Sequence, residues 1–231
     1  MKVLSNSKWG RLISLFTASE EQMRPTLTKP FKQDGYICAT DTHVIIRVAE
    51  HLIPEGQYKY EVLEKPSVEE VMPPHDPKFS VSLSELINAF VVSGIDYSTT
   101  TVECHECDND CEVEWKYTDE DGDEHSRFME CPCCNGTGYV PNAINRYCRL
   151  EGNNINAHWL LLLYSVMSEL SVYKALVSLG SKSQLRFNLA EGVDIVIMPT
   201  AKVPDTYKTP VKIKTEKILN KGEHEKDNVQ R

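Results

Sequence analysis

Two pairs of cysteines constrain what the middle of this 231-residue chain can fold into. Cys104 and Cys107 form the first pair, and Cys131 and Cys134 form the second, each with two residues in between. Each pair can place two thiolates on one tight turn, and two such turns supply the four soft ligands of a tetrahedral zinc ion. The spacing therefore predicts a structural Zn²⁺ that is bound by these four residues.

Disulfides or unligated buried thiols are the alternatives to zinc, because the chain holds eight cysteines. Residues 1–8 lack the apolar core of a secretory signal peptide, which favours a reducing cytoplasm and hence free thiols. Other residues near the pairs could replace a proposed ligand, and the sequence leaves them open as alternatives. These residues are Cys111, Cys133, His105 and His125.

The segment around and between the cysteine pairs is strongly acidic. Residues 103–130 hold twelve Asp or Glu against Lys116 and Arg127, a formal charge of −10 in a chain whose total is −9. Apolar residues alternate with polar ones over residues 113–117, Asp121-Gly122 offers a turn, and residues 125–129 can return as a second strand. The pattern predicts a zinc-closed β-hairpin. Its negative surface would repel phosphates, so protein binding fits better, and a solvated acidic loop without a partner is the alternative.

The remainder of the chain predicts an α+β protein. Hydrophobic residues make up 41% of the sequence, and no apolar run is long enough to cross a membrane. Helical spacing begins near Ser7, the capping box Ser82-Leu-Ser-Glu85 opens a second helix, and a third begins near Asn154 or Asn156. Strand-like runs around the helices predict strand-helix-strand repeats that pack helices on one side of antiparallel sheets. The expected strands cover residues 36–39, 44–48, 99–103, 147–151, 173–179, 184–189 and 193–198.

Composition divides the chain into four parts. Residues 1–102 and 141–204 carry the strand and helix patterns, and the acidic zinc-binding hairpin, residues 103–140, is inserted between them. From residue 205 to residue 231 the chain becomes Lys-rich and polar, which is typical of a flexible tail.

Several stretches resemble known protein families. Cys131-Pro-Cys-Cys-Asn-Gly-Thr-Gly138 resembles the Cys-Pro-x-Cys-x-Gly-x-Gly repeat of the J-protein chaperone zinc centre. Residues 34–46, which include Ala-Thr-Asp-Thr-His-Val-Ile, resemble the Ala-Thr-Asp-Gly-His-Arg-Leu turn of bacterial DNA polymerase sliding clamps, the beta clamps. Residues 154–163 resemble the Asn-Ala-x-Tyr-Leu-Leu helix of the same family, and residues 193–199 resemble its closing Val-Met-Pro strand. The clamp motifs occur in the family's order.

The clamp resemblance implies a β-rich clamp-like fold in the two lobe segments, with helices that line a channel for duplex DNA. It also implies a non-enzymatic role in DNA replication or repair, a homo-oligomeric ring, and an apolar pocket that receives peptides of DNA polymerase or other replication proteins. Thr42 stands where the family has Gly, and Val44 where it has Arg. The pocket positions that the resemblance carries over are Thr40, Thr42, His43, Val44, Ile45, Val196 and Met198.

Lys8 and Arg11, on the first expected helix, are the basic residues that we expect to face DNA if the ring forms. The sequence contains no Gly-rich phosphate loop with Lys-Ser/Thr, no Gly-x-Ser-x-Gly turn and no His-Glu-x-x-His helix, so we do not expect an enzyme. The alternative to a clamp-like protein is a monomeric zinc-stabilised protein-binding adaptor that does not encircle DNA. In either case we expect a cytoplasmic protein without a membrane partner.

Overall fold

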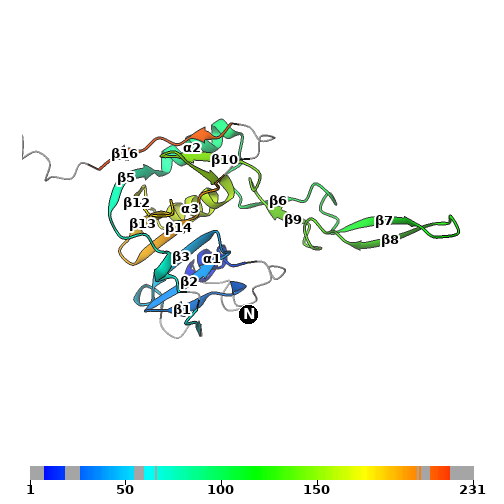
Figure 1. Cartoon of the computed structure of the whole chain (residues 1–231), viewed down its shortest axis with the longest axis horizontal. Helices are drawn as coiled ribbons and strands as arrows, with labels where there is room; N and C mark the ends of the chain where they lie inside the picture. The colour runs from blue at the N-terminus through cyan, green and yellow to red at the C-terminus, as the bar shows by residue number, and fades with distance from the viewer. Residues whose placement is uncertain are drawn as a thin grey trace, which may run out of the picture.

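The computed structural model describes residues 8–18, 27–54, 60–65, 67–201, 203 and 209–218. These residues form a body from which a long arm projects (Figure 1). In the described part of the chain, nine strands of the body form one sheet whose pairs are antiparallel, except for the last pair in the order below. Across the sheet they are β16 (Glu216–Lys217), β5 (Pro77–Ser82), β12 (Lys174–Leu179), β13 (Leu185–Ala190), β14 (Val193–Ile197), β3 (Val44–Ala49), β2 (Tyr36–Thr40), β1 (Phe31–Gln33) and β4 (Glu61–Val62).

The helices begin where the sequence places them, which confirms the α+β class. The described α-helices are α1 (Lys8–Ser14), α2 (Leu83–Ser93) and α3 (Ala157–Glu169), and two short 3-10 helices cover Glu50–Leu52 and Glu69–Val71. The Ser82 hydroxyl accepts the Glu85 N–H at 3.2 Å, and the Asn156 side chain accepts the His158 N–H at 2.9 Å, so both longer helices have the expected N-caps. Among the described residues, no helix reaches the length and apolarity that a membrane span needs.

The main hydrophobic core lies between the large sheet and the two longer helices. Leu86 and Phe90 of α2 and Leu160 of α3 are buried in the same cluster as alternate residues of β3 and β14. The intervening residues of these strands, such as Ile45 and Val196, are buried on the opposite face in a second, smaller cluster. Both faces of the central strands are therefore covered, so their sequences are almost continuously apolar rather than alternating.

A second, three-stranded sheet consists of β11 (Asn153–Asn156), β10 (Tyr147–Leu150) and β15 (Val211–Lys212). Strand β15 is parallel to β10, and the Ile213 N–H donates to the Arg149 carbonyl at 2.9 Å. The flexible tail expected from residue 205 is thus wrong for residues 209–218, because the buried Ile213 side chain joins the main core and β16 extends the large sheet. Residues 204–208 and 219–231 lie outside the described residues.

The arm is a continuous excursion of the chain between α2 and β10. Strands β6 (Thr101–Glu103) and β9 (Tyr139–Pro141) pair at its base, and β7 (Glu112–Thr118) pairs with β8 (Glu124–Glu130) farther out. The Gly122 N–H donates to the Asp119 carbonyl at 3.1 Å and closes the turn between β7 and β8. Strands from residues 1–102 and 141–204 are neighbours in the one large sheet, for example β5 and β12. The two segments therefore form one body, and the arm does not interrupt its sheet.

Ser82→Ala is expected to lower the free energy of unfolding by about 1 kcal/mol, because it removes the acceptor for the Glu85 N–H at the start of α2. Asn88→Ala is the control, since Asn88 is exposed in the middle of the same helix, away from the cap. Urea unfolding followed by circular dichroism measures both. An equal loss in the two variants would contradict the assignment of Ser82 as the cap.

Candidate metal centre

The structure brings the four predicted ligands together at the base of the hairpin formed by β7 and β8. The Sγ atoms of Cys104 and Cys131 lie 3.8 Å apart, those of Cys107 and Cys134 lie 3.6 Å apart, and all four lie within 4.8 Å of one another. Zn–S bonds of about 2.3 Å in a tetrahedron place sulfur atoms about 3.8 Å apart, whereas a disulfide requires about 2.05 Å. The buried thiols are therefore arranged as ligands for one tetrahedral metal ion.

Left-handed backbone conformations shape the turn of each cysteine pair. Asn135 and Gly136 follow the second pair with φ of 55° and 68°, and the Asn135 N–H donates to the Cys131 carbonyl at 2.7 Å. The first pair has no glycines, but Asp108 and Asn109 adopt φ of 46° and 72° in the corresponding places. Short Asp and Asn side chains tolerate this region, so the first turn can form without the glycines of the second.

Gly138 contributes to the centre through its backbone. Its N–H donates to the Cys134 sulfur at 3.3 Å, and its carbonyl accepts the Cys104 N–H at 2.8 Å. Its φ is +74°, and a Cβ atom at this position would lie 2.2 Å from Oδ1 of Asn109. A side chain therefore has no room here, and the N–H that supports the sulfur ligand requires glycine.

Cys104 and Cys107 differ in how strongly they hold their protons. Burial would raise the pKa of Cys104, but hydrogen bonds from the Glu106 and Cys107 N–H groups and from neighbouring thiols outweigh it and lower the pKa to about 6. Burial raises the pKa of Cys107 to about 12, and the hydrogen bond with Cys134 acts in the same direction. Cys104 thus forms a thiolate more readily than Cys107, from which a metal must displace a proton, so metal affinity should fall as pH falls.

The alternative ligands that the sequence left open lie outside the cluster. Cys133 and His105 are exposed, and the Cys111 thiol approaches the Asn109 carbonyl at 3.6 Å. His125 lies toward the far end of the hairpin, where its Nε2 is 2.7 Å from Asp119. None of these four residues contributes a ligand atom to the group of sulfurs in the described structure.

The three clamp-type motifs, which are far apart in the sequence, meet at the turn between β2 and β3. The His43 ring stacks on Trp159 with centroids 5.1 Å apart and an interplanar angle of 15°, and the His43 carbonyl accepts the Met198 N–H at 2.8 Å. The Asp41 carboxylate accepts the N–H groups of His43 and Val44 and so holds the turn. Trp159 is a contact that sequence reasoning missed, although it lies in the quoted helix motif.

Thr42 occupies the turn position where the clamp family has Gly, and its φ is +83°. This left-handed conformation favours glycine, which is the residue of the clamp turn at this position. The Thr42 N–H donates to the Thr40 hydroxyl at 3.0 Å, and its own hydroxyl lies 3.3 Å from Nδ1 of His43. Thr42 therefore holds the turn through its N–H and adds a polar contact at the exposed tip.

The seven residues carried over as a partner-binding pocket do not form one surface. Val44 faces the helices, whereas Ile45 and Val196 face the smaller cluster on the other side of the sheet, because successive strand residues point to opposite faces. Thr40 is buried as well. The expectation is therefore corrected for these four core residues, and Thr42, His43 and Met198 are the accessible ones of the seven.

The two residues expected to face DNA are both exposed on α1. Lys8 is exposed at the helix start, and Arg11 lies 3.5 Å from the carboxylate of Glu169 at the end of α3. The Glu169 carboxylate offsets the positive charge of Arg11, so Lys8 is the better candidate for a phosphate contact. Their role in DNA binding stays a prediction.

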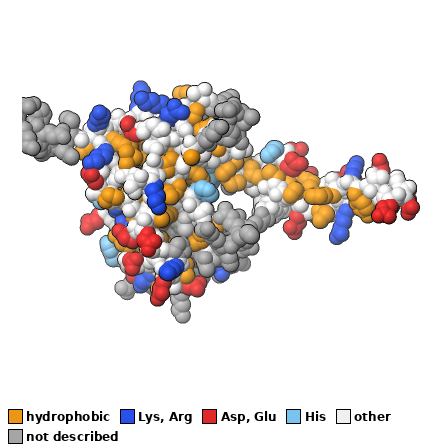
Figure 2. Space-filling model, viewed as in Figure 1, with side chains coloured by type: hydrophobic (Ala, Val, Ile, Leu, Met, Phe, Trp, Pro, Cys, Tyr) orange, Lys and Arg blue, Asp and Glu red, His pale blue; other side chains and the backbone are white. Residues whose placement is uncertain are grey.

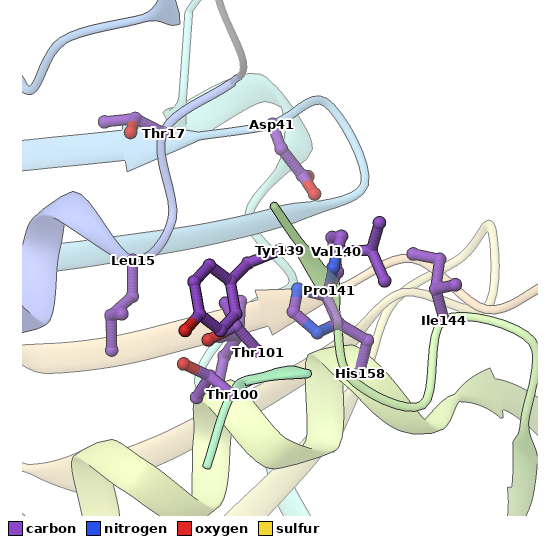
Figure 3. A pocket seen from close by; sticks show the side chains of 11 residues that line it. Leu15, Thr17, Asp41, Thr100, Thr101, Tyr139, Val140, Pro141, Ile144 and His158 are labelled. Carbon is purple, nitrogen blue, oxygen red and sulfur yellow. The ribbon is translucent and has the colours of Figure 1, made fainter. Parts of the chain in front are cut away.

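A cavity of about 310 Å³, which the sequence did not predict, opens between the body and the base of the arm (Figure 3). Asp41 and His158 contribute polar groups to it, and Tyr139 and Val140 of β9 form part of its wall. His158 Nδ1 is 3.1 Å from the Asn142 carbonyl and must donate to it, since a carbonyl only accepts. Burial lowers the pKa of His158, and the imidazole is therefore neutral at pH 7.

No protein-family model matches this chain, and no curated protein sequence matches it. Among solved structures, it is similar to the DNA polymerase III subunit beta from Pseudomonas aeruginosa, with 14% identity and a TM-score of 0.43 over 87% of this chain and 64% of that chain. The same subunit from Borrelia burgdorferi is 14% identical, with a TM-score of 0.44 over 83% of this chain and 59% of that chain. The Helicobacter pylori beta clamp bound to DNA ligase peptide is 10% identical, with a TM-score of 0.43 over 83% of this chain and 62% of that chain.

This chain thus spans about three fifths of the length of the clamp chains that it matches. An overlap at these TM-scores is too loose to assign a function.

Proposed function

We propose that this chain is a clamp-like, non-enzymatic component of a DNA replication or repair system, with an arm that a structural zinc ion closes. The observation that carries the proposal is the meeting of the three clamp-type motifs at His43, Trp159 and Met198. A single short motif occurs often by chance. Three motifs that keep the family's order and also contact one another are a more specific signal of common architecture.

The partner-docking role is proposed for the exposed side of the same turn. A Met thioether adapts its shape to an apolar anchor, and the exposed His43 ring, which stacks on the buried Trp159, lies at the same turn. Such a surface suits a short linear peptide with one large apolar side chain, as in DNA polymerase or other replication proteins. Peptide docking at this turn does not depend on whether the protein forms a ring.

Native mass spectrometry of the protein purified without chelator tests the proposed function. We expect a dimer or a larger closed oligomer, because the clamp resemblance of the sequence implies a homo-oligomeric ring, and one zinc ion per chain, because four clustered thiols can hold one metal ion. A monomer at every concentration would contradict the autonomous ring. A protein that carries no metal would contradict the zinc centre and leave the four thiols without a function.

The second candidate function is a monomeric zinc-stabilised adaptor that binds a protein and does not encircle DNA. The observation that favours it is the arm, which projects from the body and carries exposed hydrophobic side chains along its length (Figure 2). A monomer with one zinc ion in the same mass spectra would select this function over the ring.

A further inference from the structure

The register of β7 and β8 sorts the side chains of the arm into two different faces. Directly opposite residues share a face, and successive pairs alternate between the faces. All four carboxylates on these fully described strands fall on one face, which we call the acidic face: Glu112, Glu114, Glu124 and Glu130, together with Lys116, Thr118, Ser126 and Phe128. The other face, which we call the aromatic face, consists of Val113, Trp115, Tyr117, His125, Arg127 and Met129.

The aromatic face is uncovered in the described structure. The side chains of Trp115, Tyr117 and Met129 are 52%, 61% and 46% exposed, and Tyr117 stacks on His125 with centroids 5.0 Å apart. Val113 is half-buried and packs against the cysteine cluster, so the face is continuous with the metal centre. Contiguous exposed aromatic side chains on a two-stranded sheet mark an interaction site, because such a sheet has little stability by itself.

Charge decides which partner fits this face. The surroundings are acidic: the turn holds Asp119, Glu120, Asp121 and Asp123, and the acidic face lies immediately behind. A second copy of the chain would bring one formal charge of −10 against another, and nucleic acid phosphates would be repelled in the same way. A basic protein segment instead combines apolar contact with charge complementarity.

We propose that the aromatic face docks a basic protein segment, whose apolar side chains pack on Trp115 and Tyr117 while its Lys and Arg side chains reach the surrounding carboxylates. The proposal deepens the adaptor function, since it names the surface and the class of partner, and it holds whether or not the body forms a ring. His125 positions the Tyr117 ring by stacking, and Asp119 in turn holds His125 through its Nε2 at 2.7 Å. The partner would therefore meet a preformed surface.

The test uses the full zinc-loaded chain and a synthetic peptide of Lys and Leu as the probe, with a Glu and Leu peptide of the same pattern as the charge control. Calorimetry gives the affinity, and the emission of the exposed Trp115 reports contact at the face when it is taken as the difference from a Trp115→Phe variant, because the chain has three tryptophans. We expect the Lys and Leu peptide to bind and to shift this emission to shorter wavelength. We expect Tyr117→Ser to weaken binding about tenfold or more, as truncation of an aromatic anchor does.

Phe128→Ser is the matched control, because Phe128 is 66% exposed on the same hairpin but lies on the acidic face. It is expected to change the affinity less than about twofold. If both variants lose the same affinity for the peptide, or if neither loses any, the aromatic face is not the docking surface. The protein could then still be an adaptor that binds the peptide elsewhere. No binding of the basic peptide by the unmodified protein, or preferential binding of a single-stranded DNA oligonucleotide, would overturn the protein-binding adaptor itself. Equal zinc content in the three proteins excludes loss of the arm as the cause.

Discussion

Cys131→Ser is expected to abolish zinc binding and to unfold the arm while the body keeps its fold. The arm's buried cluster consists of the four cysteines with Val113 and Val140 packed against them, and it is separate from the body's core. A structural zinc ion contributes about 10–16 kcal/mol to the folding of zinc-finger peptides, far more than one hairpin supplies. Removing one ligand therefore removes most of the energy that holds the arm.

Cys133→Ser is the control for this substitution, because Cys133 lies two residues away, is exposed and stays outside the sulfur cluster. Elemental analysis gives the zinc content, and limited proteolysis within residues 104–134 reports the fold of the arm. We expect one zinc per chain and protection in the control, and no zinc and rapid cleavage in Cys131→Ser. Zinc loss in both variants, or in neither, would contradict the assigned ligand set.

Asp194→Ala is expected to destabilise the body by about 3–5 kcal/mol, because it leaves the buried Arg186 guanidinium without its carboxylate partner and leaves Arg47 with only the exposed carboxylate of Glu69. The Asp194 side chain is 3% exposed and accepts hydrogen bonds from Arg47 Nε at 2.9 Å and from Arg186 Nε and Nη2 at 3.0 Å. Asn188 adds a fourth donor at 3.1 Å. Urea unfolding at neutral pH measures the loss.

Asp76→Ala is the control for Asp194→Ala. Asp76 pairs with Lys78 at 2.6 Å, but both side chains are more than half exposed, and such pairs contribute about 0–1 kcal/mol. A similar small loss in both variants would mean that the Asp194 network is not a major source of stability.

The same network gives the body's stability a defined pH dependence. Burial would raise the pKa of Asp194, but the hydrogen bonds and charges of Arg186, Asn188 and Arg47 outweigh it and leave the pKa below its usual value. A carboxyl whose pKa is lowered in the folded state contributes stability above its unfolded pKa of about 3.9, and this stability is lost as pH falls through the folded value. The network is therefore fully stabilising at neutral pH and weakens in acid, and Asp194→Ala should remove this part of the acid dependence.

Local signals in the sequence predicted the elements and the cysteine cluster well. Ser82 and Asn156 cap the second and third helices as expected, and the turn at Asp121 and Gly122 joins the two strands of the hairpin. The spacing of the cysteine pairs was sufficient to select the four clustered thiols from eight cysteines. In each case the residues that form the structure lie within a few positions of one another or depend on one recurring spacing.

The sequence did not predict which side of the sheet each strand residue faces. Val44, Ile45 and Val196 were expected to share a pocket, but they are buried on two faces of the same sheet. A strand that is covered on both sides is a continuous apolar run, so its sequence does not indicate which residues face which side of the sheet. Ile213 was missed for a related reason, since a lone apolar residue in a polar segment becomes core only when distant strands offer it a place.

The sequence by itself determined the helices with their caps, the acidic hairpin and the four cysteines that cluster, because each depends on residues that are close together in the chain or on one recurring spacing. Only the tertiary structure decided that β5 pairs with β12, that His43 stacks on Trp159, and that the aromatic and acidic side chains of the arm separate onto two faces. These features depend on strand register and on pairing between distant segments. A shift of one residue in register would exchange the faces while leaving every local signal unchanged.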